Sequence, residues 1–106
     1  MSAFFGIDVG TNSVKGISVD ESGRILTSSS KSIPMETPKP GWAQQNPEIW
    51  WDAVCIVLGD LVAQEGGPPS AISVSGQMHS LVAVDSSGEV VYPAILWCDQ
   101  RTESQC

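Results

Sequence analysis

The apolar and polar positions at the start of the chain predict three consecutive strands. Residues 3–9 are apolar except for Asp8, and an apolar run of this length is typical of a strand buried on both faces. A second strand is expected over residues 14–19, and a third, weaker because of its serines, over residues 24–30 or beyond. The turn at residues 20–23 ends in glycine, so the pattern predicts an antiparallel meander.

A helix is predicted after a long stretch, residues 32–45, that is rich in proline and glycine and that Trp42 is expected to anchor. Residues 46–48 read Asn-Pro-Glu, in which the asparagine caps, the proline takes the first helical position and the glutamate complements the positive end of the dipole. The helix is expected to run to about Gln64, before Gly-Gly-Pro-Pro at residues 66–69. Its apolar face is expected to contain Trp50, Val54, Val57, Leu58 and Leu61.

A fourth strand is predicted over residues 71–76. Because a helix separates it from the meander, the crossover makes it parallel to the strand it joins. Residues 80–84 and 89–92 then indicate a small hairpin around a turn at 85–88, and Pro93 is expected to end it. The pattern as a whole predicts a small α/β unit.

Composition excludes some classes of partner. The 106 residues permit one small domain, and 12 acidic against 5 basic side chains give a net charge of −7, which argues against nucleic acid or an anionic membrane. No apolar run approaches the roughly 18 residues of a membrane span, and the first residues lack the pattern of a signal peptide. Cys55, Cys98 and Cys106 have no metal-ligand spacing, so we expect reduced thiols of a cytoplasmic protein, the first two of them buried.

The turn after the first strand has the residue types of an anion site. Gly10 is expected to supply a positive φ, and Thr11, Asn12 and Ser13 offer hydroxyls, an amide and a row of backbone N–H groups. Such rows form concave nests that hold phosphate oxygens. Lys15 follows within reach.

Asp8 adds a second element to this turn. It would repel a phosphate unless a cation lay between them, and Mg²⁺ takes one or two carboxylates together with phosphate oxygens. The combination therefore indicates a metal–nucleotide site. The alternative is an aspartate that caps a hairpin beside ordinary turn residues; the chain has no Walker A loop and no dinucleotide fingerprint.

A second chemical cluster follows the fourth strand at its carboxyl end, where ligands bind in open α/β sheets. Gln77 and His79 can donate and accept hydrogen bonds, and Met78 offers an adaptable apolar surface, a mixture that suits a sugar. The alternative for His79, the only histidine, is a purely structural role. The first turn and this cluster are expected to lie at one edge of the sheet.

Four stretches of the chain resemble the FGGY-type carbohydrate kinases. They are residues 6–15, residues 41–47 with Trp50 and Trp51, residues 75–80 and residues 93–101, and they cover nearly the whole chain in the family's order. The resemblance implies the ribonuclease H-like or actin-like ATPase fold. The Gly-Gln-Met-His segment looks most like that of xylulose kinases, which implies phosphorylation of D-xylulose by ATP.

The resemblance also implies roles for single residues. Asp8 would help hold Mg²⁺ through water near the transferred phosphate. The phosphates of ATP would be contacted by Thr11, Asn12 and Ser13, with Lys15 a weaker candidate. The sugar would be contacted by Gln77, Met78 and His79, and Asp99 and Arg101 match a Trp-x-Asp-x-Arg pattern for which a role at the substrate is implied. Cys98 departs from the polar residue often found in that pattern.

Length is the main departure from the family, whose members are several times longer and have two lobes. The general base and the adenine pocket would lie beyond residue 106. We therefore interpret residues 1–106 as the first part of the N-terminal lobe, inactive on its own. An open sheet edge and an uncovered apolar face would favour self-association into a homo-oligomer.

Three other interpretations stay open from the residues. One is a different sugar kinase of the same family, acting on ribulose, gluconate or glycerol. Another is a non-catalytic nucleotide-sensing or interaction module built on half of an actin-like fold. The last is an unrelated small β-rich domain.

Overall fold

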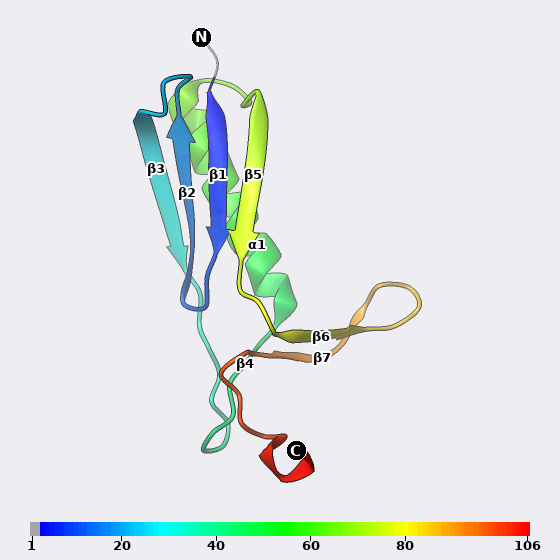
Figure 1. Ribbon diagram of the computed structural model, residues 1–106. Coiled ribbons are helices and arrows are strands. Elements are labelled where there is room, and N and C mark those ends of the chain that lie inside the picture. Colours follow the sequence, from blue (N-terminus) through cyan, green and yellow to red (C-terminus); the bar gives the residue numbers. More distant parts are fainter. Residues whose placement is uncertain (1–2) are drawn as a thin grey trace.

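The computed structural model describes residues 3–106 and contains a four-stranded sheet with one helix against it, as Figure 1 shows. The strand order is β3-β2-β1-β5. The meander is antiparallel, β5 is parallel to β1, and both relations agree with the prediction. The elements are β1 (Phe4–Val9), β2 (Ser13–Val19), β3 (Ile25–Ser32), α1 (Pro47–Glu65) and β5 (Ala71–Gly76).

Helix α1 begins and ends where its local signals place it. The Asn46 side chain accepts a hydrogen bond from the backbone N–H of Glu48 at 3.1 Å, and Pro47 occupies the first turn, where no intrahelical donor is needed. Gly66 closes the helix in the left-handed conformation, at φ 78°, and its N–H donates to the carbonyl of Val62. The predicted cap is confirmed, and the predicted end is one residue short.

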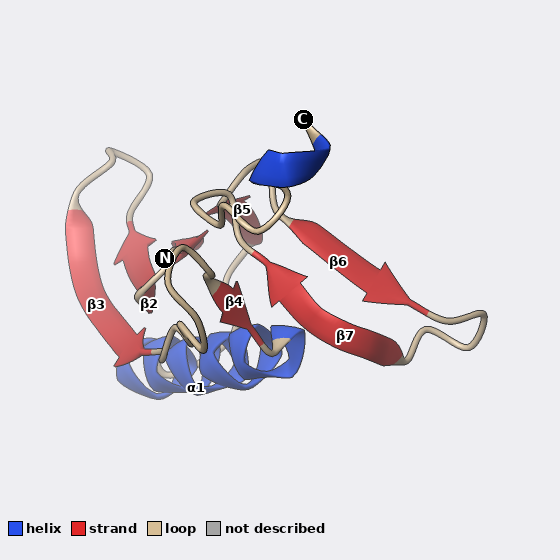
Figure 2. Ribbon diagram, turned by 90° about the horizontal axis from the view of Figure 1, so that it is seen from below, coloured by secondary structure: helices blue, strands red, loops and turns tan. Residues whose placement is uncertain are grey.

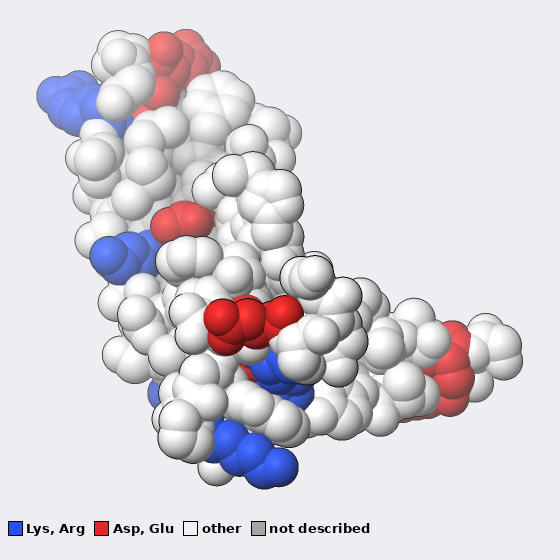
Figure 3. Space-filling view, turned by 60° about the horizontal axis from the view of Figure 1, so that its bottom comes forward, with Lys and Arg blue, Asp and Glu red and all other residues white. Residues whose placement is uncertain are grey.

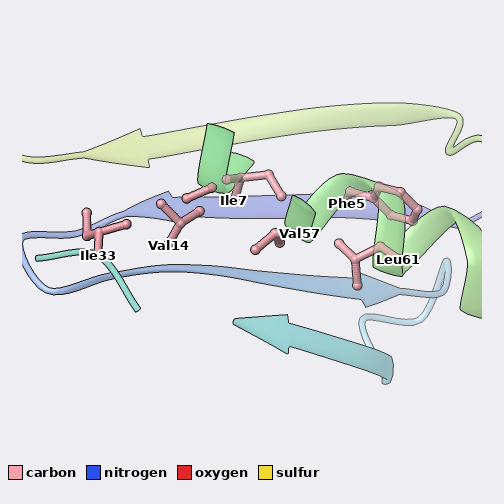
Figure 4. Packing of buried hydrophobic residues seen from close by; sticks show 7 residues of the cluster. Phe5, Ile7, Val14, Ile33, Val57 and Leu61 are labelled. Carbon is pink, nitrogen blue, oxygen red and sulfur yellow. The ribbon is translucent and has the colours of Figure 1, made fainter. Parts of the chain in front are cut away.

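The apolar core lies between α1 and the sheet. Figure 4 shows Val57 and Leu61 of the helix packed against Phe5, Ile7 and Val14 of β1 and β2. The alternation along β1 turns Asp8 to the other face, where it is exposed. The expectation that residues 3–9 are buried on both faces is therefore wrong, because within residues 3–106 only α1 covers this sheet.

Gly16 sets how closely α1 approaches β2. A Cβ atom at this position would lie 2.5 Å from Cγ1 of Val57 and 3.0 Å from side-chain atoms of Ile7 and Leu61. Such distances are well inside van der Waals contact, so a larger residue would push the helix away from the sheet. The close packing of α1 on β2 therefore requires glycine at position 16.

A second, smaller sheet lies beyond the end of the first. Its strand order is β4-β7-β6, and Figures 1 and 2 show its β6–β7 hairpin extending to one side. The strand β4 was not predicted from the sequence, since it is only two residues long. The strands are β4 (Gln44–Gln45), β6 (Leu81–Val84) and β7 (Val90–Ile95), and a short 3₁₀ turn, η1, follows at Glu103–Gln105.

Pro93 does not end the hairpin, contrary to the prediction. Strand β7 continues through it to Ile95 and pairs there with Leu81 of β6, whereas the preceding pair joins Ala83 and Tyr92. The ladder shifts between these two pairs, and Pro93 lies at the shift. A proline costs no ladder hydrogen bond at such an irregularity, because no N–H is needed there.

The cysteines also differ from expectation. Cys55 and Cys98 are exposed, as is Cys106, and all three are free thiols. Cys55 lies on α1 outside the buried stripe of Ala53 and Val57, and Cys98 lies in the turn after β7. The prediction that the first two are buried is wrong: Cys55 lies on a side of α1 that does not meet the sheet, and Cys98 lies in an exposed turn.

On the face shown in Figure 3, charged side chains form small separate groups of both signs. Most of that face carries neither acidic nor basic residues. Among residues 3–106, no helix has the length and apolar character that crossing a membrane requires.

Candidate functional site

The two clusters singled out in the sequence meet at one edge of the larger sheet. Strands β1 and β5 run in the same direction and are paired to their last residues, Val9 opposite Gly76, so the segments after them start side by side (Figure 1). Between them lies a cavity of about 340 Å³, called here the edge pocket. Its lining residues are Asp8, Val9, Gly10, Thr11, Gly76, Gln77, Met78, His79 and Trp97.

Asp8 stands where the edge pocket meets the open face of the sheet. Its Oδ1 accepts a hydrogen bond from Oγ of Ser75 at 3.2 Å. Lys15 is its direct neighbour on β2, but among residues 3–106 Asp8 forms no ion pair within 4.0 Å. Asp8 also lines a second cavity of about 340 Å³ on the open face of the sheet. Lys15 lines that second cavity and not the edge pocket.

The turn after β1 is closed by a hydrogen bond from the N–H of Gly10 to the carbonyl of Ser13, 2.9 Å long. Gly10 does not have the positive φ that was predicted. A glycine fits this position for a steric reason instead, because a Cβ atom at residue 10 would lie 3.0 Å from the carbonyl oxygen of Ser13. Thr11 lines the edge pocket, whereas Asn12 and Ser13 do not, and the carbonyl of Asn12 accepts a hydrogen bond from Ile33.

Gln77 ties the segment after β5 to this turn. Its Nε2 donates to the carbonyl of Gly10 and to Oε1 of Gln45, both at 3.3 Å, and its Oε1 accepts from Oγ1 of Thr11 at 3.5 Å. The amide predicted to meet a ligand is therefore engaged with the protein's own groups. Gln77 holds the two walls of the edge pocket against each other.

Met78 and His79 form the exposed part of the wall. His79 has φ 62°, and it is the one non-glycine residue among 3–106 with a positive φ. Its ring makes no hydrogen bond to any of those residues. Histidine is one of the residue types enriched at positive φ, and the exposed ring of His79 leaves both nitrogens accessible, so its role at a ligand stays a prediction.

Trp97 completes the edge pocket, and the sequence interpretation missed it. Its indole Nε1 donates to Oγ1 of Thr11 at 3.2 Å, its backbone N–H donates to Oγ of Ser80 at 3.1 Å, and 57% of the residue is exposed. Trp97 lies in the turn after β7, beyond the alternation of the strand, and its contact with Thr11 joins residues 86 positions apart, so residue type and spacing gave no signal for it. In the sequence, Trp97 was noted only as part of residues 93–101, which resemble the family, and no role was assigned to it.

Asp99 and Arg101 lie outside the lining of the edge pocket and form a buried ion pair. The distance between Oδ2 and Nη2 is 2.7 Å, and the side chains are 1% and 9% exposed. The guanidinium of Arg101 donates hydrogen bonds to the carboxylate, and mainly for this reason the pKa of Asp99 is lowered to about 2. The same contact raises the pKa of Arg101.

This ion pair fastens the long loop to the C-terminal segment. Asp99 also accepts a hydrogen bond from the backbone N–H of Ala43, and Arg101 donates to Oε1 of Gln44 and to the hydroxyl of Tyr92, both at 3.0 Å. The guanidinium of Arg101 lies 3.8 Å above the ring of Trp42. These contacts are those of a structural clamp, and a role of Asp99 and Arg101 at the substrate stays a prediction.

Residues 3–106 match the N-terminal domain of the FGGY family of carbohydrate kinases. The chain belongs to this family. Among curated proteins, the xylulose kinase of Lactococcus lactis is 47% identical over the whole chain, which corresponds to 22% of that protein. The chain thus spans about a fifth of the length of the curated relatives it matches.

Solved structures of the family share the fold. A ligand-bound xylulose kinase from Lactobacillus acidophilus matches 99% of this chain and 21% of its own with a TM-score of 0.94 at 36% identity. A gluconate kinase from the same species matches 98% of this chain and 22% of its own with a TM-score of 0.90 at 37% identity. The predicted fold class, the first part of an actin-like ATPase lobe, is confirmed.

Proposed function

We propose that residues 1–106 are the first part of the N-terminal lobe of a longer, two-lobed sugar kinase, the parent kinase. It transfers the terminal phosphoryl group of ATP to D-xylulose and forms xylulose 5-phosphate. The observation that carries this proposal is the edge pocket, in which Asp8 and Thr11 lie beside Met78 and His79. The family and the similarity to xylulose kinases support the choice of reaction.

Asp8 fits a role in holding Mg²⁺. It is exposed, one carboxylate oxygen is bonded to Ser75, and the other has no hydrogen-bond partner among residues 3–106. These residues contain no group of three or more carboxylate, histidine or cysteine ligands, so phosphate oxygens and water would complete the coordination. Bound there, Mg²⁺ would neutralise charge on the phosphates that Asp8 would otherwise repel.

The turn after β1 provides the remaining groups on the nucleotide side. Thr11 lines the edge pocket, and the backbone N–H groups of residues 11–13 are candidates to orient phosphate oxygens. Lys15, on the open face of the sheet, is placed for longer-range attraction of the anion. Phosphoryl transfer depends mainly on such positioning and charge compensation, and little on covalent chemistry by the protein.

The other wall suits a polyhydroxylated substrate. The ring nitrogens of His79 can donate to and accept from sugar hydroxyls, and Met78 and the exposed Trp97 offer apolar surface to the carbon faces of a sugar. A general base that takes the proton of the attacking hydroxyl is not assigned to any residue here. We place it in the part of the parent kinase beyond residue 106.

The test is a coupled assay of ATP consumption by the purified parent kinase with D-xylulose, ribulose, gluconate and glycerol. We expect the highest kcat/KM with D-xylulose. Gluconate is the second candidate, because a gluconate kinase matches the chain at a TM-score of 0.90. Preference for gluconate would move the assignment within the family, whereas no turnover with any of the four would overturn the proposed function.

A second assay separates the enzyme from a non-catalytic nucleotide-binding module. Residues 1–106 expressed alone are expected to show no turnover with ATP and D-xylulose, because one wall of a site cannot position both substrates. The parent kinase serves as the positive control. Robust turnover by the isolated segment would contradict the placement of the general base beyond residue 106.

A further inference from the structure

Gln45 is a completely buried polar side chain beneath the edge pocket. Its Nε2 donates to the carbonyls of Thr11, at 2.7 Å, and Pro34, at 3.1 Å. Its Oε1 accepts from the indole Nε1 of Trp50, at 2.8 Å, and from Nε2 of Gln77, at 3.3 Å. An amide has two donor and two acceptor positions, so every hydrogen-bonding position of Gln45 is used.

The partners of Gln45 also determine the orientation of its amide. Carbonyl oxygens can only accept hydrogen bonds, and the indole of Trp50 can only donate. A reversed amide would place its oxygen against two carbonyl oxygens and its NH₂ group against the indole N–H. The side chain therefore has one favourable orientation, and each partner is held at one position relative to the others.

These four partners come from four separate parts of the chain: the turn after β1, the segment after β3, helix α1 and the segment after β5. Two of the partners, Thr11 and Gln77, line opposite walls of the edge pocket. Thr11 belongs to the wall proposed for the phosphates, and Gln77 leads into the wall proposed for the sugar. Gln45 is the buried group that contacts both.

We propose that Gln45 is a positioning residue that sets the separation between the nucleotide wall and the sugar wall of the edge pocket. Its expected effect on turnover rests on the proposed function. Gln45 touches neither substrate; it acts through Thr11 and Gln77. Because transfer requires the phosphate and the sugar hydroxyl to be aligned, a small displacement of either wall lowers the rate and the affinity for both substrates.

Loss of stability alone would not establish this role. Removing the amide leaves the carbonyls of Thr11 and Pro34 without this donor and leaves the indole N–H of Trp50 without its acceptor inside the protein, which lowers stability whatever the role of Gln45. The test therefore compares Gln45 with a buried residue remote from the edge pocket. Val57 is suitable, because it is completely buried in the apolar core of α1 and lines no part of the edge pocket.

The experiment uses the parent kinase with Gln45→Met, which keeps the length of the side chain without its hydrogen bonds, and Val57→Ala as control. Thermal unfolding first gives a temperature at which all proteins are folded. There we expect Gln45→Met to raise KM for both ATP and D-xylulose by about tenfold. Val57→Ala should lower Tm and leave both KM values within about twofold of the unmodified protein.

A second variant keeps the proposal testable if Gln45→Met does not fold. Trp50→Phe keeps an aromatic ring and removes one hydrogen bond from the Gln45 amide, so KM should rise for both substrates by about two- to threefold. Unchanged KM values in every folded variant of Gln45 and Trp50 would overturn the positioning role.

Failure of the proposed function gives a different result. If the unmodified parent phosphorylates another sugar, the same comparison is made with that sugar. If it phosphorylates none, the proposed function fails, and the variants are compared by calorimetric titration with ADP. Weaker ADP binding by Gln45→Met alone supports the positioning role, whereas equal affinities, or no binding by the unmodified parent, overturn it.

Discussion

The larger and the smaller sheet of this chain are held together by different forces. The larger sheet combines continuous backbone ladders with an apolar core beneath α1, to which Phe5, Val14 and Leu61 contribute. The smaller sheet has short ladders, and the loop and turn next to it are fastened by the buried ion pair of Asp99 and Arg101. The first arrangement relies on burial and the second on charge.

The edge pocket lies where these two regions meet. Thr11 belongs to the turn of the larger sheet, and Trp97 follows the last strand of the smaller one. The shape of the edge pocket therefore depends on an apolar core on one side and on a charged clamp on the other. The comparison predicts that the two regions respond differently to mutation, pH and isolation.

The largest stability change should come from breaking the buried ion pair. Arg101→Met leaves the carboxylate of Asp99 buried without its partner, which should cost about 3 kcal/mol of the free energy of unfolding. Arg24→Met is the matched control, because Arg24 pairs with Asp20 at the surface and its side chain is 78% exposed. Urea denaturation gives the free energy of unfolding of each variant. An equal loss for Arg101→Met and Arg24→Met would contradict the expected difference between a buried and an exposed ion pair.

A large effect on turnover is expected from Asp8→Asn in the parent kinase. The change removes the charge proposed to hold Mg²⁺ and should lower kcat by about 10²- to 10³-fold while the protein stays folded. Asp60→Asn is the control, since Asp60 is exposed on α1 and bonds only to Ser29 among residues 3–106. A kcat near that of the unmodified enzyme would exclude Asp8 from the reaction.

The core of the larger sheet is tested through two glycines. Gly16→Ala forces a Cβ atom against Val57 and Leu61 and should destabilise the protein by about 1–3 kcal/mol. Gly59→Ala, on α1 with open space around it, should stabilise it by about 0.5–1 kcal/mol. Urea denaturation gives both values. A neutral Gly16→Ala would mean that α1 does not pack tightly on β2.

Acid should weaken the clamp before it weakens the core. The pKa of Asp99 is about 2 in the folded protein, because Arg101 donates hydrogen bonds to it, and about 3.9 for an unfolded aspartate. A depressed folded pKa contributes stability above pH 4, and this contribution is lost as the pH falls from about 4 to 2. Asp99→Asn should therefore flatten the dependence of the urea midpoint on pH in this window. An unchanged slope would argue against the clamp.

The smallest effect concerns assembly of the isolated segment. Within the described residues 3–106, strand β5 pairs with β1 and with no other strand, and Val74 on it is 65% exposed, so the isolated segment is expected to self-associate. Val74→Lys should increase the monomer fraction in light scattering. Val84→Lys, on the β6–β7 hairpin, should not. A monodisperse monomer of the unmodified segment would contradict this prediction.

Local signals made much of the larger sheet predictable. The cap formed by Asn46 and Pro47 depends on neighbouring residues alone, and the alternation of short strands with tight turns gave the meander. The parallel pairing of β1 and β5 follows from the helix that precedes β5, because a helical crossover returns the chain to the end of the sheet from which it left. These features can be predicted without knowing which residues distant in the sequence come into contact.

The errors share one cause. Whether Pro93 ends a strand depends on the partner ladder, and whether Cys55 is buried depends on which face of α1 meets the sheet. Gly10 is needed for space near a carbonyl and not for its φ angle. Each answer involves an atom far away in the sequence or in an unknown orientation, so residue type and spacing could not supply it.

The chain by itself determined its family motifs, its helix and most of its strands, because these arise from short-range preferences and from residues adjacent in the sequence. Tertiary structure alone decided that Trp97 closes the edge pocket and that Gln45 joins its two walls. The role of a buried amide depends on the donors and acceptors around it, and these come from segments that only folding brings together.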